Sequence, residues 1–371
     1  EQAGEAARAA AYLARAGETA VALSAFREAQ ALFERALILA AELPRRDQEA
    51  TLTRQLAGVH LALSEFDAAR HLLEESLALA RLLDDPAGIA AALGGLGRVA
   101  TEQGAYGEAK TLLEAALELA RTSGDTASLV PILKNLGMAN VWLGHYAAGQ
   151  AYLEESLTLA RESGDQPAMA SALNHLGHLA LDQGAYAEAE ARLAESLSLA
   201  RAIGDRSSVV VALLNLGMVA YRQGAYPEAD TYAQDALALA RAIDSKWLIA
   251  GVLGQLGLTA CELGALARPR ARAALRAALQ TATEAGATPV ALYALLGLAR
   301  LRELEGQPEA AVELLGLVLH HPANISGTRE TAGPLLAHLR ATLPAATVAA
   351  ALERGQALDL AAVVQASLAE E

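Results

Sequence analysis

Residues 170–205 read ASALNHLGHLALDQGAYAEAEARLAESLSLARAIGD, and the stretches forty residues before and after them have nearly the same sequence. The pair formed by Gly184 and Tyr186 recurs at Gly104 and Tyr106, at Gly144 and Tyr146, and at Gly224 and Tyr226. Ser64 and Phe66 form a degenerate copy of the same pair. A fixed period of this length indicates a repeat array, in which each unit contacts only its neighbours.

Each repeat is predicted to contain two amphipathic helices, because apolar residues recur at spacings of three, four and seven in both of its halves. In the quoted copy these residues are Leu173, Leu176, Gly177 and Ala180, followed by Ala189, Leu193, Leu197 and Ala200. Gly184 and Ala185 make a short turn between the halves, and Tyr186 opens the second helix. We therefore expect an αα-hairpin, with a first helix A and a second helix B.

Glycine recurs in the middle of helix A, where it costs about 1 kcal/mol relative to alanine. The glycines are Gly97, Gly137, Gly177, Gly217 and Gly257. Small residues follow on helix B, twelve positions after the first four of these glycines, at Ala109, Gly149, Ala189 and Ala229. We predict that small residues face each other there, so that the two helix axes approach closely.

The ends of the helices are marked as regularly as their centres. An arginine lies in the last turn of helix B, where a cation complements the helix dipole, at Arg81, Arg121, Arg161, Arg201 and Arg241. Glycines are then expected to end the helix and aspartates to cap the next one, at Gly124, Asp125, Gly164, Asp165, Gly204 and Asp205. Pro86 and Pro167 suit the first turn of helix A.

The composition is 53% hydrophobic and only 4% aromatic, which favours an all-α fold built from small-residue helix packing. A net charge of -14 would repel a phosphate backbone, so we expect no nucleic acid partner. The single cysteine, Cys261, excludes an internal disulfide and fits a reducing compartment. No signal peptide is recognisable, and the longest apolar run, 209–214, is far below the roughly 20 residues of a membrane span. A cytoplasmic protein without a membrane partner is expected.

The predicted array covers residues 1–325. Its eight repeats start near residues 10, 50, 90, 130, 170, 210, 250 and 290, with a two-residue insertion near 268–270 in the seventh. Residues 326–371 depart from the pattern and are predicted to form two or three short capping helices. Terminal units of a solenoid degenerate in this way because they meet water or another domain.

The repeated set Leu176, Gly177, Gly184, Tyr186 and Ala189 resembles the tetratricopeptide repeat, over residues 10 to 322. The period of 40 in place of 34, and the lack of a proline after helix B, are departures from that pattern. This longer form is similar to kinesin light chain repeats and, more closely, to the C-terminal arrays of bacterial STAND-type signalling NTPases, the group that contains the maltose-regulon activator. The resemblance implies a right-handed superhelix and an NTPase domain linked to the N-terminal side of the array.

In that family the A helices line a concave groove, and carrying over its positions gives a candidate ligand-binding set. The candidates are Lys134, Asn135, Met138, Trp142, Asn174, His175, His178, Asp182, Asn215, Met218, Tyr221, Arg222 and Gln255. These are positions at which otherwise similar repeats differ. Positions that differ are free to recognise a ligand, whereas repeated ones hold the array together.

Two chemical features stand out in this set. Asn135, Asn215 and Gln255 lie in one column, and an amide can donate and accept hydrogen bonds to the backbone of an extended peptide. Met138, Trp142, Met218 and Tyr221 add adaptable apolar contacts. The alternative for both features is structural, since such side chains at helical spacing also serve as core or as bonds to a neighbouring repeat.

Other motifs have simpler explanations. His175, His178 and Asp182 share a helical face that could hold a metal, although a polar groove wall explains them better. His320 and His321 precede Pro322 at a helix end, where capping is expected. Gly95 and Gly97 match the spacing of a dinucleotide-binding fingerprint, but they lie inside a predicted helix, and no P-loop is present. Asn324 begins a glycosylation sequon only in form. Cys261 is assigned to packing. We expect no catalytic residues, no metal and no cofactor.

The sequence therefore predicts a non-enzymatic module that binds a peptide or protein segment, as the sensor or scaffold of a bacterial signalling protein. The alternative is a structural or self-associating array that acts as a spacer or an oligomerisation surface.

Overall fold

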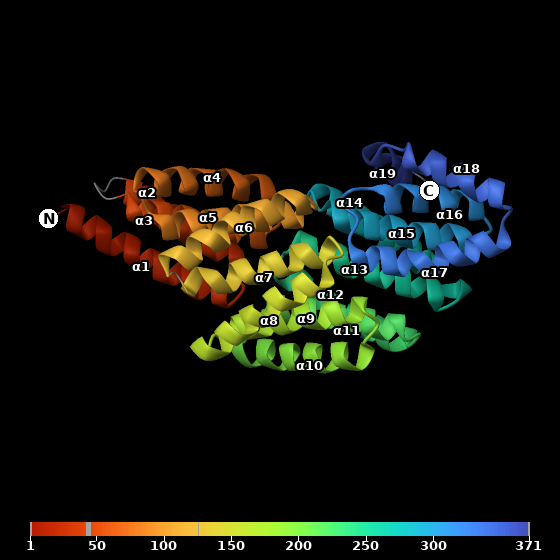
Figure 1. The fold of residues 1–371 in the computed structure, drawn as a ribbon, viewed down its shortest axis with the longest axis horizontal. Helices are drawn as coiled ribbons and strands as arrows, with labels where there is room; N and C mark the ends of the chain where they lie inside the picture. Colours follow the sequence, from red (N-terminus) through yellow and green to blue (C-terminus); the bar gives the residue numbers. More distant parts are fainter. Residues whose placement is uncertain (1, 42–45, 125, 370–371) are drawn as a thin grey trace. The chain divides into compact units, whose positions relative to one another are not determined.

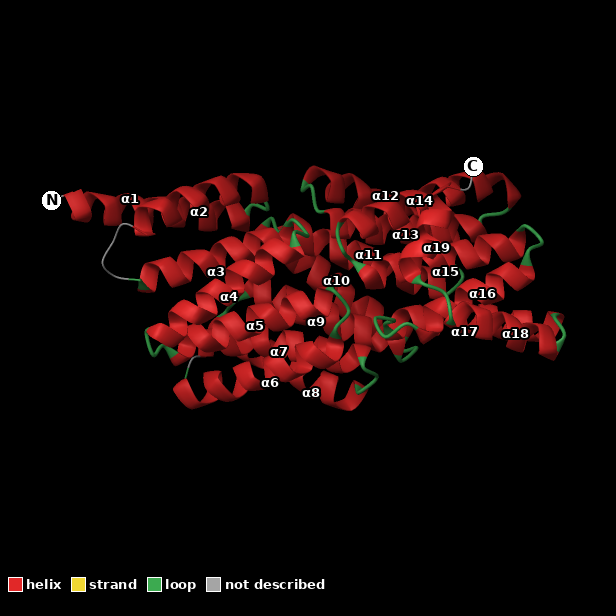
Figure 2. Ribbon diagram, turned by 90° about the horizontal axis from the view of Figure 1, so that it is seen from above, coloured by secondary structure: helices red, strands yellow, loops and turns green. Residues whose placement is uncertain are grey.

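The computed structural model describes residues 2–41, 46–124 and 126–369, and all regular structure in these ranges is helical. The expected all-α solenoid of helix-turn-helix repeats is confirmed, and Figure 2 shows its helices joined by short loops. No helix in the described ranges combines the length and apolar character that crossing a membrane requires.

Helices A and B alternate along the chain (Figure 1). The A helices are α1 (Gln2–Ala22), α3 (Asp47–Ala62), α5 (Pro86–Glu102), α7 (Thr126–Trp142), α9 (Gln166–Asp182), α11 (Arg206–Arg222), α13 (Lys246–Glu262) and α15 (Thr288–Leu304). The B helices are α2 (Phe26–Ala41), α4 (Phe66–Leu82), α6 (Tyr106–Ser123), α8 (Tyr146–Ser163), α10 (Tyr186–Ile203), α12 (Tyr226–Ala242), α14 (Arg268–Glu284) and α16 (Pro308–His320). A 3₁₀ turn, η1 (Ala265–Ala267), precedes α14, at the predicted insertion. The chain ends in α17 (Ser326–Thr342), α18 (Ala345–Gln356) and α19 (Leu360–Ala369).

The turn within each hairpin requires a left-handed residue. Gly184 has φ +75°, and the N–H of Ala185 donates to the carbonyl of Ala180 at 2.8 Å, which closes helix A. In the degenerate copies Ser24 and Ser64 adopt the same conformation, with φ of 58° and 64°.

The predicted caps between repeats are confirmed where the structure describes them. Gly164 and Gly204 end their B helices with φ of +70° and +74°. Asp165 Oδ1 accepts from the N–H of Ala168 at 3.0 Å, and Asp205 Oδ1 accepts from the N–H of Ser208 at 3.1 Å. Asp125, for which the same role is expected, lies outside the described residues.

The predicted close approach of helices A and B is confirmed at Gly97 and Gly177. A Cβ at Gly97 would lie 2.5 Å from Leu113 Cγ on helix α6, and one at Gly177 would lie 2.7 Å from Leu193 Cγ on α10. Both distances are far below normal contact, so only glycine permits these crossings. Gly217 is less crowded, since the nearest neighbour of a Cβ built there, Tyr232 Cβ, lies at 3.4 Å.

The chain divides into two compact units. Unit 1 comprises Glu1–Leu176 and Glu195–Val209, and unit 2 comprises Gly177–Ala194 and Val210–Glu371. The division falls inside the repeats, whereas the sequence places the end of the array at residue 325. Within unit 2, α17 packs on α15 and α16, α18 packs on α16, and α19 packs on α14.

Candidate functional site

In unit 1 the candidate residues of helix α7 form an accessible strip beside a buried one. Lys134, Asn135 and Trp142 are partly exposed, whereas Met138 is buried at 4% exposure. The ring of Trp142 lies 5.3 Å from that of Tyr106, which opens helix B of the preceding repeat. Trp142 therefore has an inter-repeat contact as well as accessible surface.

Two charged residues of helix α5, Arg98 and Glu102, interact electrostatically with Lys134. The pKa of Lys134 is lowered to about 8, chiefly by burial and then by the charge of Arg98, while the charge of Glu102 opposes the shift. Burial also raises the pKa of Glu102, against the lowering effect of Arg98 and Lys134. Arg98 and Glu102 were missed by the sequence reasoning, although they stand forty residues before Met138 and Trp142 in the same two columns.

Helix α9 contributes Asn174 and His175 to unit 1 and His178 and Asp182 to unit 2. Asn174 and Asp182 are buried, while the two histidines are partly exposed. His178 Nδ1 lies 3.8 Å from Asp182 Oδ2. Nowhere in the described ranges do three His, Cys, Asp or Glu side chains gather as metal ligands would.

The amide column is buried in unit 2. Asn215 is 5% exposed, and Gln255 has no exposed surface. Gln255 Nε2 donates to Thr259 Oγ1 at 3.2 Å, and Gln255 Oε1 accepts from the hydroxyl of Tyr293 at 2.6 Å. The amide of Gln255 thus links α13 to α15.

Helix α11 carries three further candidates, all partly exposed: Met218, Tyr221 and Arg222. The Tyr221 ring lies 5.5 Å from that of Tyr226 at the start of helix α12. Burial, reinforced by the charge of Glu262, raises the pKa of the Tyr221 hydroxyl well above its ordinary value. The hydroxyl is therefore a neutral group that can donate a hydrogen bond.

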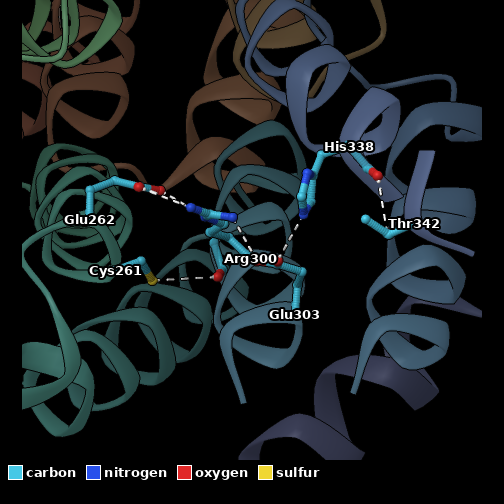
Figure 3. A network of polar contacts seen from close by, with 7 residues as sticks. Cys261, Glu262, Arg300, Glu303, His338 and Thr342 are labelled. Carbon is cyan, nitrogen blue, oxygen red and sulfur yellow. Dashed lines mark hydrogen bonds and ion pairs between the residues drawn. The ribbon is translucent and has the colours of Figure 1, made fainter. Parts of the chain in front are cut away.

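A polar network beside these residues links three helices (Figure 3). Arg300 donates to both carboxylate oxygens of Glu262, from Nε at 2.7 Å and from Nη2 at 3.0 Å, and from Nη1 to Glu303 at 2.6 Å. His338 Nε2 of α17 lies 3.5 Å from the other oxygen of Glu303. A bidentate arginine pair of this kind fixes geometry as well as charge.

Burial keeps the side chains of Cys261 and Asn324 from reacting at the protein surface. Cys261 is 3% exposed, and burial raises the pKa of its thiol to about 12, so it stays protonated and serves as packing. Asn324, the first residue of the sequon, is 4% exposed and unsuited to glycosylation. His321 directly follows the last residue of helix α16, and its Nδ1 accepts from the N–H of Ala323 at 3.1 Å, a bond within the turn after the helix.

The first turn of α17 lies against the candidate residues of unit 2. Arg222 Nη2 donates to the carbonyl of Gly327 at 3.1 Å. A Cβ at Gly327 would lie 3.5 Å from Asp182 Oδ1 and 3.9 Å from the ring of His178. No pattern in the sequence predicts these contacts, because they join residues more than a hundred positions apart.

Solved structures that share the fold at low sequence identity include the following three. A signal transduction ATPase with numerous domains (STAND) and a tetratricopeptide repeat sensor, from Pyrococcus horikoshii, is 16% identical, with a TM-score of 0.50 over 85% of this chain and 46% of that one. The Rap conjugation gene regulator of plasmid pLS20, in complex with the Phr* peptide, is 14% identical, with a TM-score of 0.62 over 74% and 73%. A Rap protein complexed with Competence and Sporulation Factor is 15% identical, with a TM-score of 0.59 over 98% and 97%.

The chain spans about half of the STAND protein's length, and no curated protein matches its sequence. A family model described as tetratricopeptide repeat matches residues 48–122, 128–202 and 168–242, which together make up more than half of the chain. These matches fall on the hairpins whose glycines and aromatic residues are described above. The chain belongs to the tetratricopeptide repeat family.

Proposed function

We propose that the chain is a non-catalytic module that binds a peptide or protein segment on its A-helix face, as the sensor or scaffold part of a bacterial STAND-linked signalling protein. Membership of the repeat family supports a role in binding. The bound Phr* peptide of one similar fold and the sensor role of another support the peptide ligand and the signalling context. An NTPase domain linked to this chain is part of the proposal.

The observation on which the proposal depends most is the accessible strip of helix α7. Lys134, Asn135 and Trp142 remain partly exposed on a helix whose apolar positions from Ile132 to Val141 are buried. The amide of Asn135 can pair with a peptide backbone, and the Trp142 ring can cover an apolar side chain. Two basic residues, Arg98 and Lys134, and one acidic residue, Glu102, lie in or beside the strip. The strip therefore favours a ligand with an acidic group.

The other candidates are divided by their accessibility. His175 of unit 1 keeps accessible surface, as do His178, Met218, Tyr221 and Arg222 of unit 2, and they stay proposed ligand-binding residues of their own units. The buried ones, namely Met138, Asn174, Asp182 and Asn215, are assigned a supporting role beneath them. Gln255 is left out of the face, since its amide is bonded within unit 2.

A displayed library of random 12-residue peptides tests the proposal. Peptides selected on the wild-type chain should bind at least tenfold more weakly to a variant with Lys134→Ala and Asn135→Ala. The control is Arg201→Ala, an exposed cation in the last turn of α10, which should bind as the wild type does. Undiminished binding to the double variant, with helicity intact in all three chains, would refute the proposed face.

A self-associating array is the second candidate function, supported by exposed apolar residues near the N-terminal repeats. Ile38 and Leu82 are 66% and 69% exposed, and Ile38 borders a shallow groove between α2, α3 and α4 that also contains Leu37 and Leu79. Light scattering over a hundredfold range of concentration tests this alternative. Growth in mass that Ile38→Glu abolishes would favour it over ligand binding.

A further inference from the structure

Helix α17 covers part of the face to which ligand binding is assigned in unit 2. Its first turn places the carbonyl of Gly327 on Arg222 at 3.1 Å and the backbone of Gly327 against Asp182 and His178. All of these residues belong to unit 2. The turn therefore rests on three residues that the sequence assigns to a ligand.

The rest of α17 is held by a second group of contacts. Ala332, Leu336 and Leu339 are buried, and His338 lies 3.5 Å from Glu303 of α15 (Figure 3). Because Glu303 also pairs with Arg300, the far end of α17 joins the network that ties α15 to α13. Contacts with A helices thus occur at both ends of α17.

As an isolated helix, α17 would be weak. It contains Gly327, Gly333 and, inside the helix, Pro334. Both residue types destabilise a helix relative to alanine, an interior proline far more than a glycine. The helical state of this segment therefore depends on its docking, and release from the face would cost α17 much of its helix.

The docked turn also leaves buried polar atoms without a hydrogen-bond partner in the protein. These atoms are both side-chain amide atoms of Asn324, Thr328 Oγ1, His178 Nδ1 and Arg222 Nε. A buried polar group that stays unpaired is destabilising, because it has lost its hydrogen bonds to water. The contact is thus incompletely paired, so a segment that satisfied these atoms would bind there more strongly.

We propose that residues 323–331 are an intramolecular ligand of the A-helix face of unit 2, and that a peptide binding to that face displaces α17. The chemistry favours a peptide with a small residue at the position of Gly327, where a carbonyl must reach Arg222, and with polar groups beside it. This inference rests on the proposed function and names both the occupant of the face and its means of regulation.

Two glycines of α17 offer a matched pair of variants. Gly327→Asp would bring a second carboxylate against Asp182 and repel it, although aspartate near a helix N-terminus favours the helix itself. Gly333→Asp is the control, because nothing lies within 4 Å of its Cβ position. Hydrogen exchange of the amides in residues 328–342 should speed up at least tenfold in Gly327→Asp and stay within about threefold of wild type in Gly333→Asp.

A labelled synthetic peptide with the sequence of residues 321–336 then probes the vacated face. In the wild-type chain the tethered segment, at an effective concentration on the order of 1 mM, should outcompete 10 µM peptide about 100-fold. The peptide should bind to Gly327→Asp at least tenfold more tightly than to wild type or Gly333→Asp. Adding Arg222→Ala to Gly327→Asp should abolish that gain, as should Gly327→Asp in the peptide.

Thr331→Pro, at the last residue of the docked segment, interrupts α17 and removes the bond from the Thr331 hydroxyl to the carbonyl of Gly327 at 2.7 Å. It provides a second way to release the helix if Gly327→Asp fails to fold. Unchanged exchange in both folded variants, or a released α17 without peptide binding, would overturn the inference. The test uses a peptide copied from the chain itself and involves only unit 2. It therefore remains valid if the library-selected peptides prove indifferent to Lys134 and Asn135, the result that refutes the proposed function.

Discussion

At the scale of single residues, two glycines of neighbouring A helices have opposite roles. Gly97 in α5 lies against helix α6, and a Cβ there would meet Leu113 Cγ at 2.5 Å and the carbonyl of Ala109 at 3.3 Å. Gly58 in α3 has nothing within 4 Å of its Cβ position. The first glycine allows two helices to approach, whereas the second only weakens its own helix.

Alanine substitution should therefore change stability in opposite directions at these two positions. Gly97→Ala is expected to lower the free energy of unfolding by about 1–2 kcal/mol, because the overpacking cost exceeds the gain in helix propensity. Gly58→Ala should raise it by up to about 1 kcal/mol. Urea unfolding followed by circular dichroism measures both, and equal shifts of the two midpoints would contradict the packing explanation.

Lys134 differs from the only other lysines of the chain, Lys110 and Lys246. Its pKa is lowered to about 8 by burial and by Arg98, so its amine should become reactive near pH 8. Acylation rates of the three lysines, followed by mass spectrometry between pH 6 and 11, should show the lowest midpoint for Lys134. A midpoint of Lys134 equal to that of the other two lysines would refute the claim that burial and Arg98 lower its pKa.

The same shift has a consequence for stability. The unfolded chain holds the Lys134 proton up to about pH 10.4, whereas the folded chain releases it near pH 8. Between these values the unfolded state binds more protons, so stability should rise with pH relative to a Lys134→Met variant. Denaturation at pH 7.5 and pH 9.5 should show the difference between the two chains growing in favour of wild type.

At the scale of elements, neighbouring helices are joined by two kinds of polar contact. Ser156 of α8 is fully buried and donates to the carbonyl of Val130 in α7 at 3.0 Å, and Ser196 repeats the bond to Ala170 at 2.7 Å. Glu155 instead accepts from Arg121 of the preceding B helix at 2.8 Å, on a half-exposed surface. Buried bonds resist salt, whereas exposed ion pairs do not.

These adjacent residues allow a direct comparison. Ser156→Ala should lower the free energy of unfolding by about 1 kcal/mol at every salt concentration. Glu155→Gln should lower it by less than about 0.5 kcal/mol, an effect that vanishes in 1 M salt. Denaturation curves at low and high salt give both values, and a salt-sensitive Ser156→Ala would argue against the buried bond.

Local patterns made most of the elements predictable. The aromatic residue after each turn opens helix B from α2 to α12, as expected from its recurrence, for instance at Phe66 and Tyr186. The seventh repeat, which has the insertion near residue 268, lacks this aromatic residue, and its helix B, α14, begins after a 3₁₀ turn. The bond from Tyr293 to Gln255 and that from Arg222 to Gly327 could not be predicted, since they join residues 38 and 105 positions apart without any repeating pattern.

At the scale of the whole molecule, contacts between adjacent hairpins replace a single shared core. Unit 1 contains separate clusters of buried residues, one around Phe33 and Leu56 and another around Leu113 and Leu136. Stability in such an array is a sum of local terms. The period of the sequence predicted this organisation, whereas it contained no information on the division into two units within the repeats.

Damage to one hairpin should therefore stay local. In Gly97→Ala, amide exchange should speed up in α5, α6 and α7, while α13, α15 and α16 keep their wild-type protection. Native-state hydrogen exchange resolved by peptide mass spectrometry tests this expectation. An equal loss of protection in both sets of helices would mean that the chain unfolds as one cooperative body.

The junctions after Gly164 and Gly204 are interchangeable, and this affects how the number of repeats can change in evolution. Both have a left-handed glycine followed by an aspartate that caps the next helix, with nearly equal φ values of +70° and +74°. A gene rearrangement that duplicates or deletes the forty codons between them rebuilds the same junction. The lineage of this chain can thus gain or lose whole hairpins in single genetic events, without having to evolve a new linker.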